Sequence, residues 1–190
     1  MTTIEIIGAL VSLLYLWLEY KAKIWLWVVG VITPVIYIYI FFVSKFYADM
    51  GVNIYYLFAS MYGWYRWKKV STGETGFQIT RLPLRLVWKL FIVCIGLFAL
   101  IAWILICFTD SPVPYGDALT TALSIVAMWM LAHKYAEQWL VWLLVNIVSS
   151  GLYFYKDLYP TGVLFIIYAI VSIFGYLKWK KMTNELKTKN

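Results

Sequence analysis

The stretch GWYRWKK at Gly63–Lys69 recurs as GYLKWKK at Gly175–Lys181, 112 positions later. With this offset, residues 47–69 fall on residues 159–181. Besides the lysine pairs, the identities are Tyr47 with Tyr159, Ile54 with Ile166, Tyr56 with Tyr168, Ser60 with Ser172, Gly63 with Gly175 and Trp67 with Trp179. Any two membrane helices with basic ends would share the lysines and the last tryptophan, but not the aligned Tyr, Ser and Gly. The pattern therefore predicts an internal duplication.

Further upstream, we align the two halves with an offset of 115. This offset pairs Trp27 with Trp142 and Tyr20 with Tyr135. The two offsets differ by three residues, and this difference in length would then lie in the loop after the second apolar span of each half.

The composition requires a lipid bilayer. The chain has 190 residues, of which 64% are hydrophobic and 13% are charged, against about 45–50% and about 25% in soluble domains. A span needs roughly 20 mostly apolar residues, and we predict an all-α integral membrane protein with seven of them. They lie at about 4–20, 24–44, 48–67, 87–108, 117–133, 138–155 and 160–179.

The repeat arranges these spans as 3+1+3. A three-span unit ends on the side opposite its start, so a single linking span returns the chain and makes the two units parallel, which is a known transporter plan. The predicted organisation is a first repeat (1–69), a cytoplasmic linker (70–86), a linking helix with an outer loop (87–116), a second repeat (117–181) and a cytoplasmic tail (182–190).

The basic residues predict the orientation. Only Lys45 and Lys156 lie on the side of the N-terminus, whereas the other fourteen of the 16 Lys and Arg residues lie on the opposite side. Cytoplasmic loops carry the excess of Lys and Arg, so we expect the N-terminus outside and the C-terminus in the cytoplasm. The net charge of +7 does not predict nucleic-acid binding, because the charges sit in short loops and form no continuous basic face.

Two matching helix faces could bind a ligand or pack together. The third span places Asn53, Tyr56, Ser60, Gly63 and Trp67 on one face, and the seventh places Phe165, Tyr168, Ser172, Gly175 and Trp179 there. Small residues on such a face favour close helix packing. The tyrosine hydroxyls and Asn53 need polar partners at membrane depth, so packing and a pocket both stay open for them.

The sixth span carries a more specific stripe of Trp139, Trp142, Asn146, Ser149 and Tyr153. Two indole rings one turn apart form a stacking wall, and an amide deeper in the span supplies a donor and an acceptor. The combination suits a flat, polar ring, whether cationic or neutral; the alternative is an interfacial tryptophan belt with an interhelical Asn bond. The candidate substrate-binding residues are Trp139, Trp142, Asn146, Asn53, Tyr56, Tyr168, Tyr153 and Trp27.

Other chemistry is not indicated. The chain has no GxxxxGK[ST] phosphate loop, and Glu19, Asp49, Asp117, Glu137 and Asp157 all lie near span ends. Proton relays use ionisable groups within the spans, so ion-coupled pumping is disfavoured. We predict no catalytic residues, no cofactor and no metal site, and we expect that the protein is not an enzyme.

Three stretches resemble the Pnu vitamin transporters, the PnuC-type nicotinamide riboside carriers. They are FYADMGVNIYYLFASMYGWYRW (46–67), WLVWLLVN (139–146) and YKDLYPTGVLFIIYAIVSIFGYLKWKK (155–181). The resemblance implies a SWEET-like fold in the bacterial inner membrane, commonly a homotrimer. It also implies facilitated uptake of an unphosphorylated vitamin, nicotinamide riboside by default, which a cytoplasmic kinase then traps.

The resemblance supports Trp139, Trp142 and Asn146 as substrate-site residues, but it leaves the vitamin open. Relatives often have Gln where this chain has Asn53, and the PnuT branch carries thiamine, which is also a flat cation. Thiamine uptake by the same mechanism is therefore the alternative, and a non-transporting membrane protein is the alternative class.

Overall fold

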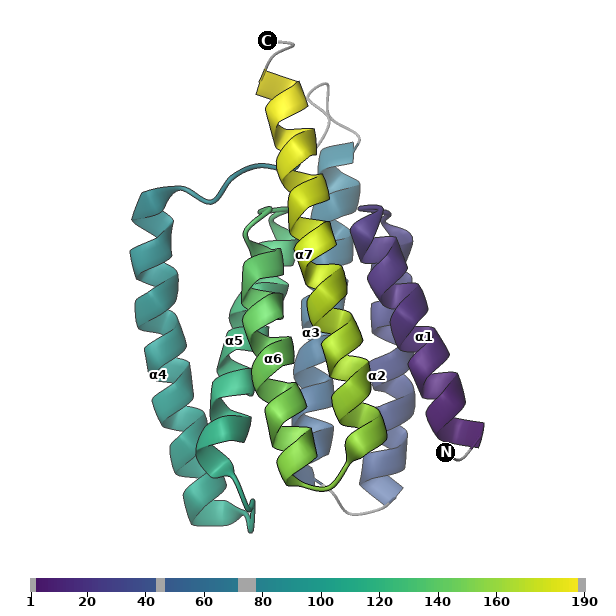
Figure 1. The fold of residues 1–190 in the computed structure, drawn as a ribbon, viewed down its shortest axis with the longest axis vertical. Coiled ribbons are helices and arrows are strands. Elements are labelled where there is room, and N and C mark those ends of the chain that lie inside the picture. Colours follow the sequence, from purple (N-terminus) through teal and green to yellow (C-terminus); the bar gives the residue numbers. More distant parts are fainter. Residues whose placement is uncertain (1–2, 44–46, 72–77, 188–190) are drawn as a thin grey trace. The chain divides into compact units, whose positions relative to one another are not determined.

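A computed structural model describes residues 3–43, 47–71 and 78–187. Within these ranges the chain forms seven helices and no β-strand (Figure 1). They are α1 (Thr3–Tyr20), α2 (Trp25–Val43), α3 (Tyr47–Ser71), α4 (Leu84–Phe108), α5 (Pro114–Ala132), α6 (Gln138–Tyr155) and α7 (Tyr159–Lys187). The predicted all-helical fold is confirmed. The main differences are that α3–α5 extend a few residues beyond their predicted spans and that α7 continues into the predicted tail.

Four helices meet the length and hydropathy of a membrane span over described residues, namely α4, α5, α6 and α7. The helices α1 and α2 contribute shorter apolar segments, Leu10–Tyr20 and Trp25–Tyr39. Helix α4 exposes large apolar side chains along its length, including Trp88, Ile92 and Trp103. Such a surface is stable against lipid and not against water.

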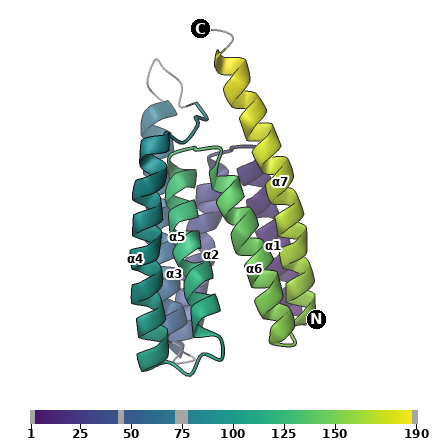
Figure 2. The ribbon, with the colours of Figure 1, turned by 60° about the vertical axis from the view of Figure 1, so that its left-hand side comes forward.

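The chain divides into two compact units, Met1–Gln78 and Ile79–Asn190. In the first unit α2 packs against both α1 and α3, and in the second unit α6 packs against both α5 and α7. Helix α4 belongs to the second unit and lies along α5 (Figure 2). The division falls inside the predicted linker 70–86, of which residues 72–77 lie outside the described part, as do residues 188–190 of the predicted tail.

One offset of 112 relates the two repeats throughout, so the predicted change to 115 is wrong. The loops that join the first two helices of each repeat have a residue in the left-handed conformation, Ala22 (φ 51°) and Lys134 (φ 53°). The N–H groups of these residues donate to Glu19 O and Leu131 O, which are again 112 positions apart. The loops therefore have the same length and the same hydrogen bonds.

Tryptophan packing supports the same correction. In the first unit the indole of Trp27 meets Trp67 edge to face, with ring centroids 5.5 Å apart, and a Cβ at Gly63 would overlap the Trp27 ring. In the second unit Trp139 meets Trp179 at 5.9 Å. A Cβ at Gly175 would overlap the Trp139 ring in the same way. The counterpart of Trp27 is thus Trp139, and the match with Trp142 arose because tryptophan recurs three residues later.

A short segment before α4 is bound to the rest of the second unit. The Thr80 N–H donates to Lys134 O (3.1 Å), and Thr80 O accepts from the Ala136 N–H (3.0 Å). The Leu82 N–H donates to Glu137 Oε2 (2.8 Å). Residues 79–82 therefore lie against the α5–α6 loop and form part of the second unit.

Candidate functional site

The polar centre of the second unit lies between α6 and α7. Asn146 is buried, and its Nδ2 donates to Ser172 Oγ at 3.2 Å. The Ser172 hydroxyl in turn donates to the Tyr168 carbonyl oxygen at 2.8 Å. A buried polar group is stable only when it is hydrogen-bonded, so this chain of bonds sets the direction of the Asn146 amide.

Aromatic rings continue this interface along the two helices. The rings of Tyr153 and Phe165 have centroids 5.0 Å apart, and those of Phe165 and Tyr168 are 5.5 Å apart. The predicted stripes of the sixth and seventh spans therefore face each other. Among the candidate residues, the structure brings Asn146, Tyr153 and Tyr168 into one continuous interface with Ser172 and Phe165.

The two tryptophans of α6 have different surroundings. Trp139 is completely buried and fills the space above Gly175, which gives it a packing role. Trp142 is only half-buried, and its indole Nε1 has no hydrogen-bond partner within the described residues. A binding role for either residue stays a prediction, and Trp142 is the more exposed of the two.

The remaining candidates belong to the first unit. Trp27 is fully buried in the packing described above. Asn53 and Tyr56 are half-buried on α3, and the ring of Tyr56 lies 5.6 Å from that of its neighbour Tyr55. The structure describes this unit by itself, so a binding site that includes these residues stays a prediction.

The corrected offset identifies where the two repeats differ. Trp142 and Asn146 correspond to Gly30 and Pro34, so the bulky ring and the amide are present only in the second repeat. The sequence analysis missed a third such position, Gln138, which corresponds to Leu26. Its spacing of four residues from Trp142 and eight from Asn146 was the signal that could have found it.

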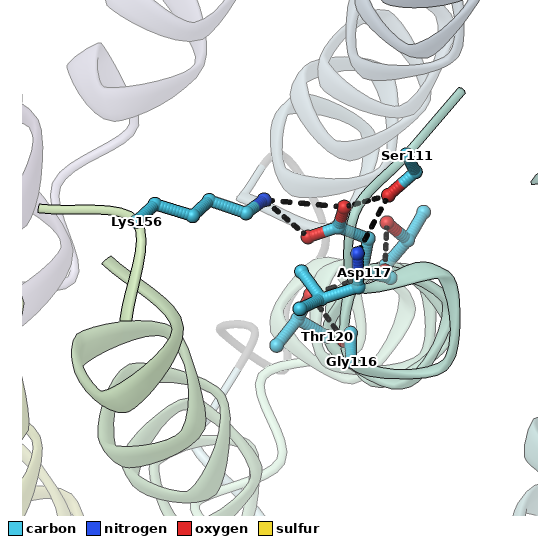
Figure 3. Close-up of polar contacts among 7 residues, drawn as sticks. Ser111, Gly116, Asp117, Thr120 and Lys156 are labelled. Atoms are coloured by element: carbon cyan, nitrogen blue, oxygen red, sulfur yellow. Dashed lines mark hydrogen bonds and ion pairs between the residues drawn. The ribbon is translucent and has the colours of Figure 1, made fainter. Parts of the chain in front are cut away.

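A charged cluster binds the start of α5 to the loop between α6 and α7 (Figure 3). Lys156 Nζ lies 3.0 Å from Asp117 Oδ1 and 3.2 Å from Oδ2. The Ser111 hydroxyl donates to Asp117 Oδ2 at 2.7 Å. Asp117 also lies in the first turn of α5, where a carboxylate is favoured by the helix dipole. These partners give Asp117 a structural role at the span end.

The α5–α6 loop carries a second group of polar and aromatic side chains. His133 stacks on Trp129, with ring centroids 3.8 Å apart, and its Nδ1 lies 2.8 Å from Trp129 O. Burial lowers the pKa of the neighbouring Lys134 to about 8, because desolvation disfavours the ammonium form.

Over the described residues, no group of three His, Cys, Asp or Glu side chains is placed to bind a metal ion.

Comparison with known proteins identifies the family. The family described as Nicotinamide mononucleotide transporter matches residues 2–181. The chain is 28% identical to the nicotinamide riboside transporter PnuC of Escherichia coli (strain K12), over 96% of its own length and 87% of the relative's. It is 24% identical to the riboflavin/roseoflavin transporter RibM of Streptomyces davaonensis, over 92% of its own length and 83% of the relative's.

The fold matches a solved transporter. The crystal structure of the vitamin B3 transporter PnuC superposes with a TM-score of 0.74 and 25% sequence identity. The alignment covers 93% of this chain and 80% of that one.

Proposed function

The chain belongs to the nicotinamide mononucleotide transporter family, and from that premise we propose that it carries nicotinamide riboside through a membrane. The family and its relatives are transporters, so the chain is a multi-pass membrane transporter and not an enzyme. The identity of the vitamin is the proposal. It rests on the relatives named nicotinamide riboside transporter and on the residues of α6.

The single observation that carries the proposal is the pair Trp142 and Asn146. The ring of Trp142 is half-buried and offers an aromatic face to a cationic pyridinium. The Asn146 Nδ2 donates to Ser172 Oγ, so this hydrogen bond uses the amide nitrogen and not Oδ1. That oxygen is an acceptor for the carboxamide N–H of the ligand. Tyr153 and Tyr168 would border the same site.

The proposed mechanism is facilitated diffusion. Helix α6 carries no ionisable Asp, Glu, Lys or Arg residue, and neither does α7 between residues 159 and 177. Ion coupling normally uses such groups at membrane depth. Net uptake then requires that the substrate be removed inside, and phosphorylation by a cytoplasmic kinase would do this because a carrier that fits a cationic ring and a neutral sugar would not accept the added anionic phosphate.

We further propose that the protein is a homotrimer of the bacterial inner membrane with its N-terminus outside. The trimer and the membrane follow from the family resemblance, and the orientation follows from the distribution of Lys and Arg. Thiamine is the alternative ligand, since it also presents a flat cation to Trp142. The relative that carries riboflavin adds a third ligand to any test.

The proposal predicts tight binding of nicotinamide riboside. The purified protein would be titrated separately with nicotinamide riboside, thiamine and riboflavin, with calorimetric heat and tryptophan fluorescence as readouts. We expect saturable heat and a fluorescence change with the riboside alone. Binding of thiamine or riboflavin alone would keep the transporter and replace the vitamin. Binding of none of the three would contradict the proposed function.

A further inference from the structure

Gln138, the first residue of α6, has an unusual environment. Its side chain is completely buried, and neither Nε2 nor Oε1 has a hydrogen-bond partner among the residues that the structure describes. A primary amide offers two donors and one acceptor, and burying such groups without partners destabilises a fold. A residue with this cost requires a reason to be there.

Folding does not supply that reason. The corresponding residue of the first repeat, at the offset of 112, is Leu26, which is also completely buried. The backbone is equivalent at the two positions, because the Leu26 N–H donates to Lys23 O and the Gln138 N–H donates to Tyr135 O. The same local structure therefore forms around an apolar side chain in the first repeat.

Gln138 shares a helix face with the proposed site residues. Positions 138, 142 and 146 are four apart, so their side chains follow one face of α6 over about 12 Å at 1.5 Å per residue. Along this face lie the Gln138 amide, the Trp142 indole Nε1 and the Asn146 amide, and the first two have no partner within the described part. The first repeat has Leu26, Gly30 and Pro34 at these positions. All three polar groups are thus specific to the second repeat.

We propose that Gln138 is a further specificity-determining residue, whose side-chain amide hydrogen-bonds the neutral, hydroxyl-bearing part of the substrate. This inference rests on the proposed function. An amide donates and accepts at once, as a hydroxyl group does, and so the two match. In the proposed site Trp142 and Asn146 serve the cationic ring and its carboxamide, which leaves the Gln138 amide for the sugar hydroxyls. Gln138 therefore selects a ring that carries a sugar over the ring alone.

The test compares two ligands on Gln138→Leu and Gln138→Met. Leucine is the residue that the first repeat uses, and methionine keeps the length of glutamine without its hydrogen bonds. Affinities for nicotinamide riboside and for 1-methylnicotinamide, which has the cationic ring without the sugar, are measured by calorimetry and by competition. We expect about a tenfold loss of riboside affinity in both variants. The affinity for 1-methylnicotinamide should stay within about twofold.

Thermal stability separates this role from a structural one. Removal of an unpartnered buried amide should leave the melting temperature equal or higher, whereas a structural glutamine would give a lower melting temperature and equal losses for both ligands. Leu26→Met is the matched control, because it changes the shape at the same position of the first repeat and should leave riboside affinity unchanged.

Riboside affinity within about twofold of wild type in both Gln138 variants would overturn the role of Gln138 and leave the proposed function intact. A wild-type protein that binds neither the riboside nor thiamine would overturn both. If thiamine alone binds, the affinities of the Gln138 variants are compared for thiamine instead, whose hydroxyethyl group then has the part of the sugar.

Discussion

At the scale of single residues, α6 places a packing tryptophan and a candidate binding tryptophan three positions apart. Trp139 is buried against Gly175 and Trp179, whereas Trp142 is half-buried. Trp142→Ala should weaken vitamin binding by about 1–3 kcal/mol, the range for loss of an aromatic stacking partner, with a small change in melting temperature. Calorimetric titration and a thermal melt on the same samples would measure both effects.

Trp139→Ala is the matched variant with the opposite expectation. It removes a large buried side chain, which typically costs about 3–5 kcal/mol of stability, so the melting temperature should fall strongly. Trp27→Ala should behave in the same way, because Trp27 has the same packing in the first repeat. A stable Trp139→Ala protein with lost binding would instead return Trp139 to the substrate site.

The residues also indicate how far sequence alone can identify the site. The stripe that contains Trp142, Asn146 and Tyr153 was predictable, because helix periodicity determines which side chains share a face. The difference in burial between Trp139 and Trp142 was not predictable, since Trp139 packs against Gly175 in another helix. Gln138 follows the same periodicity, but its burial and its lack of hydrogen-bond partners among the described residues are seen only in the folded unit.

At the scale of elements, the loops after α1 and α5 reverse the chain through a residue with positive φ. In neither loop is it glycine; the residues are Ala22 and Lys134. The left-handed conformation costs an L-residue roughly 1–2 kcal/mol, and glycine avoids this cost but loses more entropy on folding. Ala22→Gly should therefore raise the free energy of unfolding by up to about 1 kcal/mol, as measured by denaturant or thermal unfolding in detergent.

Ala59→Gly provides the control for this prediction. Ala59 lies inside α3, where glycine is less favourable than alanine by about 0.5–1 kcal/mol, so this variant should be less stable. If both variants lost stability equally, the positive φ at Ala22 would not be the source of strain.

The helix bounds were largely predictable and the contacts of the linker were not. Apolar runs of sufficient length identify membrane helices because the bilayer sets their length, and the structure agrees within a few residues at most ends. From the sequence, segment 79–82 was predicted to be part of the linker. In the structure its hydrogen bonds go to residues 134–137. Such long-range backbone pairing has no local sequence signal.

At the scale of the whole molecule, the placement of charge predicts the orientation in the membrane. In the predicted topology, fourteen of the 16 Lys and Arg residues share the side of the C-terminus, and Lys45 and Lys156 share the other. This bias is large, and loops shorter than about 60 residues follow the positive-inside rule. We expect the C-terminus and the α5–α6 loop in the cytoplasm, and the α4–α5 loop outside.

Reporter fusions would test this orientation in cells. Green fluorescent protein fluoresces only in the cytoplasm, and alkaline phosphatase is active only outside it, so a fusion after residue 190 should fluoresce and lack phosphatase activity. A fusion after Ser111, which truncates the chain in the α4–α5 loop, should give the opposite result. The proposed kinase trapping does not depend on this orientation, because facilitated diffusion runs in both directions and the cytoplasmic kinase sets the direction of net uptake. Phosphatase activity at the C-terminus, or fluorescence of the fusion after Ser111, would contradict the predicted orientation and would leave the proposed facilitated diffusion intact.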